Sequence, residues 1–154
     1  MVRKVSLSSG NGRRHLKQPL SRQDADAIIV RFRVALEAVR QGRTDDACIK
    51  ALVHVFLLVA FLKDAGHSRI SADILRTTGD ALFAHINGVR DLAGKPLPVA
   101  QLAQIVNEYD QQLRETRFEV LLKASQQLAG AYRNMKMRRD AQTLTAVEEL
   151  EVCA

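Results

Sequence analysis

The 154-residue sequence predicts an all-α protein: an antiparallel bundle of four main helices with a disordered basic N-terminal arm and a short C-terminal helix. Apolar residues recur at spacings of three and four along most of the chain, and no segment keeps the two-residue alternation of a half-buried strand. Glycine and proline separate the periodic segments. We therefore expect a flexible basic arm over residues 1–20, a helical bundle domain over 21–140, and a C-terminal tail or short helix over 141–154.

The first helix is expected to begin after Ser21, because serine is a favoured N-cap and Asp24 then places negative charge in the first turn. Gly42 is expected to end this helix, since glycine readily adopts the left-handed conformation that closes a helix. The arm before it contains serine and glycine among basic residues and has no apolar periodicity. The predicted inner face of the first helix consists of Ile28, Ile29, Phe32, Leu36 and Val39.

The second helix is predicted to follow Asp45 and Asp46 and to end before Gly66. Its centre is the apolar run over residues 51–62, which covers nearly every side of a helix and therefore predicts the most central element. As a helix this run would be about 18 Å long, against about 30 Å for the hydrocarbon core of a bilayer. The run therefore predicts a buried core helix and no membrane span.

The third helix is predicted to start at Ser71, with Ile70 and Leu75 placed to pack together across its first turn. Both Asn87 and Gly94 are suitable residues for its end, and the sequence does not choose between them.

A fourth helical pattern begins at Pro98 and continues to about Arg139, which would make a helix of about 63 Å. We expect this helix either to bend, near Arg114 or at Gly130, or to project past the bundle with its basic end. Thr145 and Glu148 have the spacing of a capping box and predict the short terminal helix.

The composition excludes several classes of protein. With 47% hydrophobic residues the chain is too apolar to be disordered, and two cysteines do not make a disulfide scaffold. Cys48 and Cys153 are isolated, which favours a reducing, cytoplasmic compartment.

The net charge of +6 is concentrated at the ends of the chain. Residues 1–22 carry six basic side chains and no acidic one, residues 23–132 are balanced, residues 133–140 contribute +3, and residues 141–154 contribute −3. Such clusters contact phosphates without reading sequence, although basic tails also serve solubility alone. The predicted nucleic-acid-binding residues are Arg13, Arg14, Lys17, Arg133, Lys136, Arg138 and Arg139.

No constellation predicts catalysis. The four histidines lack the helical spacing of metal-ligand pairs, and His54 is interpreted as a core histidine that His85 could meet across the bundle. Cys48 is interpreted as a packing residue, because the neighbouring acidic residues oppose a reactive thiolate. We therefore predict no enzyme activity, no metal, no cofactor and no small-molecule substrate.

The sequence thus favours a helical subunit that self-associates or docks on a protein partner and contacts nucleic acid through its basic termini. The alternative is a purely protein–protein interaction or regulatory bundle with no role in nucleic-acid binding. A weaker hypothesis is a helix-turn-helix with its turn at Gly66, in which the recognition face would consist of Arg69, Arg76, Thr77 and Thr78.

Overall fold

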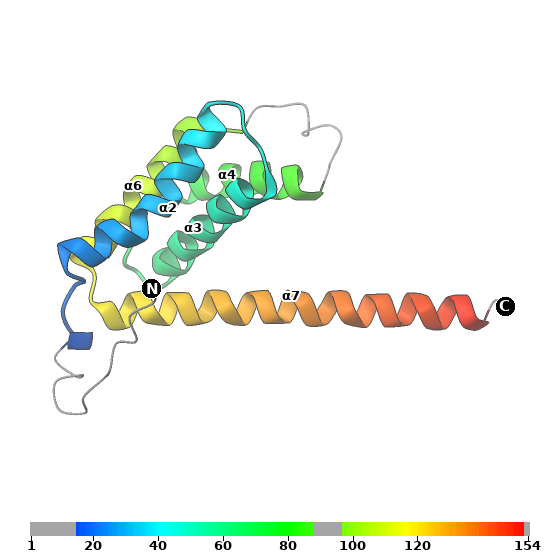
Figure 1. Ribbon diagram of the computed structural model, residues 1–154. Helices are drawn as coiled ribbons and strands as arrows, with labels where there is room; N and C mark the ends of the chain where they lie inside the picture. Colours follow the sequence, from blue (N-terminus) through cyan, green and yellow to red (C-terminus); the bar gives the residue numbers. More distant parts are fainter. Residues whose placement is uncertain (1–14, 88–96, 153–154) are drawn as a thin grey trace.

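The computed structural model describes residues 15–87 and 97–152, with side chains described through residue 136. This part of the chain is all-helical, with five helices and no β-strand (Figure 1). The prediction of an all-α protein is therefore confirmed. The helices are α2 (Arg22–Arg40), α3 (Asp46–Asp64), α4 (Ala72–Asn87), α6 (Val99–Glu115) and α7 (Phe118–Val152).

The predicted signals at the starts of α2 and α4 and at the ends of α2 and α3 are confirmed. The Asp24 N–H donates to Ser21 Oγ (3.1 Å) at the start of α2, and the Ile74 N–H donates to Ser71 Oγ (3.2 Å) at the start of α4. Gly42 and Gly66 close α2 and α3 with φ of 84° and 83°, the left-handed region that glycine enters without a steric penalty.

Helix α3 is the centre of the fold, as its all-round apolar sequence predicts. It packs against each of the other four helices. Between its acidic ends, α3 carries only three basic side chains, which are Lys50, His54 and Lys63. A helix with so few polar residues has no polar face and is therefore covered on all sides. Its buried apolar residues are Ile49, Ala51, Leu52, Val53, Val55, Phe56, Leu58, Val59 and Leu62.

Helices α2 and α6 run antiparallel and are joined on the surface by a connected set of ion pairs (Figure 1). Arg33 on α2 pairs with Asp110 on α6 (2.6 Å), and Arg114 on α6 pairs with both Asp110 (2.9 Å) and Asp26 on α2. Exposed ion pairs of this kind contribute little individually, and a shared network fixes the register of the two helices better than isolated pairs do.

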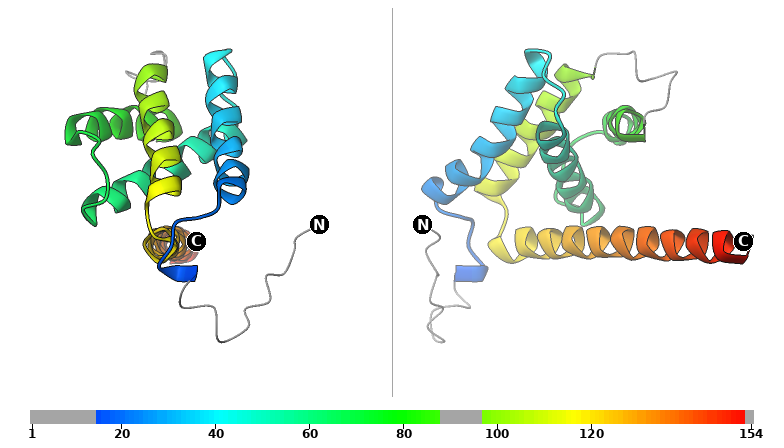
Figure 2. Two further views of the ribbon diagram at one scale, coloured as in Figure 1. Left: turned by 90° about the vertical axis from the view of Figure 1, so that its left-hand side faces the viewer. Right: turned by 45° about the vertical axis from the view of Figure 1, so that its right-hand side comes forward.

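The arrangement differs from four antiparallel helices at the C-terminal end. The fourth expected helix is divided at Thr116 and Arg117 into α6 and α7, and α7 turns away from the end of α6 and packs against α3 (Figure 2). The bend near Arg114 that the sequence allowed is therefore present. Thr116 adopts an extended conformation, which ends α6.

A separate short C-terminal helix is not observed. The backbone of α7 is helical without interruption from Phe118 to Val152, so residues 141–152 continue it. Gly130 does not bend it, although glycine costs about 1 kcal/mol relative to alanine in a helix. No proline follows Pro98, so nothing in the sequence removes a helical hydrogen bond from α7.

The expected N-terminal arm is held to the body over its last residues. The Phe118 N–H donates to the Gln18 carbonyl (2.9 Å), Pro19 forms an isolated bridge with Arg117, and Leu20 packs against the core. Residues 15–20 therefore belong to the folded body. Residues 1–14 of the expected arm lie outside the described part of the chain.

Candidate nucleic-acid interface

Helix α7 is both the longest element and the one that leaves the body. Its 35 residues span about 52 Å. Leu121, Ala124 and Leu128 are buried against the rest of the protein, whereas every described side chain after Leu128 is partly or fully exposed. Figures 1 and 2 show the second half of α7 projecting past the other helices. This projecting half carries the second basic cluster.

Arg133 and Lys136 are exposed on the projecting half of α7, and no described carboxylate pairs with either of them. Arg138 and Arg139 lie on the same helix, and their side chains are outside the described ones. The described half of this cluster is therefore accessible to an anionic partner.

Lys17, the one described residue of the N-terminal cluster, lies near the start of the same helix. Lys17 is exposed beside the start of α7, and Arg13 and Arg14 fall outside the described residues. Arg133 comes fifteen positions after Phe118, a rise of about 22 Å along the helix. The structure therefore places Lys17 near the start of α7 and away from Arg133 and Lys136, which are further along the helix.

An aromatic row fixes the last contact of α7 with the body, and sequence reasoning missed it. The ring of His54 on α3 lies 6.0 Å from that of Phe32 on α2 and 6.2 Å from that of Tyr132 on α7. Phe32 also meets Tyr109 edge-on at 5.6 Å. The aromatic residues are too few and too widely spaced in the sequence for periodicity to reveal this row.

His54 makes the stability of this contact dependent on pH. Desolvation, followed by the charge of Arg31, lowers the pKa of His54 below its ordinary value near 6.5. The unfolded chain therefore binds this proton more readily than the folded protein does. The contribution of His54 to folding stability is fully present above about pH 6.5 and declines as the pH falls below it.

We predict that the free energy of unfolding declines between pH 7 and pH 5, and that His54→Gln reduces this decline. Urea titrations at a series of pH values measure it. His85→Gln is the matched control, because it removes another half-buried imidazole outside the aromatic row. An identical pH dependence in wild type and His54→Gln would contradict the prediction.

The helix-turn-helix interpretation does not fit the contacts of α4. Thr78 is buried and its hydroxyl donates to Gln101 Oε1 (3.1 Å), so it faces α6. Arg76 pairs with Asp73 on its own helix (3.4 Å). The Thr77 hydroxyl likewise donates to the Asp73 carbonyl (2.9 Å). Three of the four expected recognition residues therefore already make contacts within the protein.

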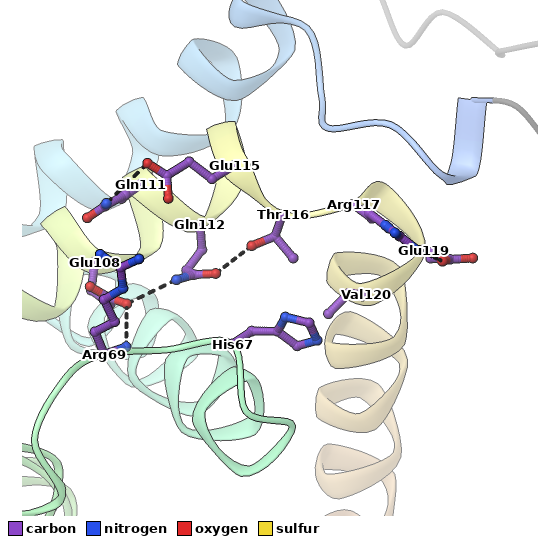
Figure 3. Close-up of a pocket in the computed structure, with 10 residues that line it drawn as sticks. All are labelled: His67, Arg69, Glu108, Gln111, Gln112, Glu115, Thr116, Arg117, Glu119 and Val120. Carbon is purple, nitrogen blue, oxygen red and sulfur yellow. Dashed lines mark hydrogen bonds and ion pairs between the residues drawn. The ribbon is translucent and has the colours of Figure 1, made fainter.

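A polar hollow of about 540 Å³ lies where the α3–α4 loop, the end of α6 and the start of α7 meet (Figure 3). Glu108 accepts hydrogen bonds there from Ser68 Oγ (2.9 Å), the Arg69 N–H (3.1 Å) and Gln112 Nε2 (3.1 Å). Thr116 Oγ1 donates to Gln112 Oε1, so this set of hydrogen bonds reaches the break between α6 and α7. All three hydrogen bonds go to Oε1 of Glu108 and tie the α3–α4 loop to α6, which gives this carboxylate a structural role.

The described residues supply no metal or nucleophile centre. No group of three histidine, cysteine or acidic side chains among them could hold a metal ion. A hydrogen bond to Asp45, followed by desolvation, raises the pKa of the Cys48 thiol and keeps it protonated at neutral pH. This environment does not activate the thiol as a nucleophile.

Comparison of the chain with protein-family models, with curated proteins and with solved structures finds no match. Among the described helices, none combines the length and the apolar character that a bilayer crossing requires.

Proposed function

We propose that the protein is a non-enzymatic helical subunit that self-associates or docks on a protein partner and contacts nucleic acid through its basic ends, without sequence specificity. The observation that carries this proposal is the position of Arg133 and Lys136. Both are exposed on the half of α7 that projects past the body, within a stretch over residues 120–139 that contains no acidic residue. A cationic helix held away from the body can approach a phosphate backbone without burying any ion.

We propose that the other predicted basic residues also contact the nucleic acid. Lys17 lies beside the start of α7, Arg138 and Arg139 follow Lys136 on the helix, and Arg13 and Arg14 precede Lys17 in the sequence. The cytoplasm is the proposed compartment, because isolated cysteines suit a reducing environment.

Fluorescence anisotropy with labelled duplex and single-stranded oligonucleotides tests the proposal. We expect the logarithm of the affinity of the wild type to fall linearly with the logarithm of the salt concentration. The double variant Arg133→Ala/Lys136→Ala should weaken binding to every sequence alike and reduce the salt slope by about one for each lost phosphate contact.

The matched control is Arg43→Ala/Lys50→Ala, which removes two exposed cations at the far end of the body. We expect this control to bind like the wild type. The proposal fails if the wild type does not bind at about 50 mM salt, where phosphate contacts are strongest, or if the two double variants bind equally.

The purely protein-binding alternative is favoured by a different surface. Val30 and Val34, one turn apart on the outer side of α2, are 55% and 63% exposed. Apolar side chains in such positions suit a protein partner. An oligomer in light scattering combined with no nucleic-acid binding would support this alternative.

A further inference from the structure

The charge of α7 is divided along its length. Residues 120–139 contain five basic residues and no acidic one, whereas residues 140–152 contain four acidic residues and no basic one. Because the backbone is one helix from Phe118 to Val152, these two blocks lie at different levels along a single straight axis. A helix with this charge pattern is complementary to its own reversed copy.

The projecting half of α7 also has an apolar face of its own. Positions 137, 141 and 144, which are Met, Ala and Leu, recur at steps of four and three and therefore share one face of the helix. Position 147, a valine, follows three residues later at the edge of this face. Met137 comes nine positions, or two and a half turns, after Leu128, so this face is opposite to the one that meets the body.

We propose that α7 pairs with α7 of a second copy of the chain in an antiparallel orientation. With Met137 level with Val147 of the second copy, Arg133 comes level with its Glu151 and Lys136 with its Glu148. The same contacts repeat about a two-fold axis, so the interface closes as a dimer.

Two physical arguments favour this occupant. A parallel pair would set like charges side by side along the whole helix, whereas the antiparallel pair sets opposite charges together. Most of the stability of a helix in a protein comes from the packing of its apolar face, and pairing gives the projecting half of α7 such a packed face. The inference rests on the self-association in the proposed function. Because the pairing uses Arg133 and Lys136, it competes with nucleic acid for these two side chains, so dimerisation is measured on protein freed of nucleic acid.

Sedimentation equilibrium of the nuclease-treated full chain, over a hundredfold concentration range, tests the pairing. We expect a monomer–dimer equilibrium that weakens at high salt. Arg133→Glu/Lys136→Glu and Glu148→Lys/Glu151→Lys should each raise the dimer dissociation constant by at least about tenfold, and the combined quadruple variant should restore it. Arg43→Glu/Lys50→Glu is the charge-matched control and should dimerise like the wild type. Circular dichroism of each variant verifies that the helix content is retained.

Disulfide trapping tests the antiparallel orientation of the two helices. Both proteins carry Cys48→Ser and Cys153→Ser. A mixture of the Met137→Cys and Val147→Cys proteins should form a cross-linked dimer on oxidation, and Met137→Cys alone should not.

Three results would overturn the proposal. They are a monomer at every concentration, a quadruple variant that stays dissociated, and Met137→Cys cross-linking to itself as readily as to Val147→Cys. A monomeric wild type that still binds oligonucleotides would overturn this inference and leave the nucleic-acid function standing.

Discussion

Leu128→Ala is expected to lower the free energy of unfolding by about 2–5 kcal/mol, the usual cost of removing a fully buried leucine side chain. Leu128 is only 2% exposed and is the last α7 side chain in the core among those described. Urea unfolding followed by circular dichroism measures the change. Leu122→Ala on the same helix is the matched control, because Leu122 is 38% exposed and should cost less than about 1 kcal/mol.

The same substitution should act locally before it acts globally. Because Leu128 joins α7 to the core around α3, its truncation should increase amide hydrogen exchange in residues 118–132 more than in α2 or α6. Equal stability losses in Leu128→Ala and Leu122→Ala, or uniform exchange across all helices, would contradict this view of how α7 is held.

Glu108→Ala is expected to destabilise the protein by roughly 1–3 kcal/mol, because it removes the acceptor of three hydrogen bonds. Gln112, which is 6% exposed, would lose a partner for its amide nitrogen, and the Arg69 N–H would lose its carboxylate. Thermal and urea unfolding measure the loss. Glu115→Ala is the control, since Glu115 is exposed and accepts only from Gln111 among the described groups (3.2 Å); a loss as large in Glu115→Ala would contradict the assigned role of Glu108.

Structural features that depend on residues close together in the sequence could be predicted from it. The ends of α2 and α3 follow from Ser21, Gly42 and Gly66, because caps and left-handed turns are local interactions. The central place of α3 follows from its composition, since a helix that is apolar on all sides must be covered on all sides. The basic clusters are likewise visible in the sequence as charge.

The direction of α7 could not be predicted, because the contacts that set it are distant in sequence. The break at Thr116 contains neither glycine nor proline, and it is stabilised by the contact of Phe118 with Gln18 and of Arg117 with Pro19. Apolar periodicity is the same in a straight and in a divided helix, so the pattern could not show that the basic cluster would project from the body.

The corner between α6 and α7 sets the direction in which α7 leaves the body, and the burial of Leu121, Ala124 and Leu128 holds α7 in that direction. Position 139 lies about 31 Å from Phe118 along the axis, so a rotation of about 10° at the corner displaces it by about 5 Å, close to one helical pitch. The hydrogen bonds that link Glu108, Gln112 and Thr116 end at this corner. The side chains that shape the corner therefore decide how far the basic block of α7 lies from the body.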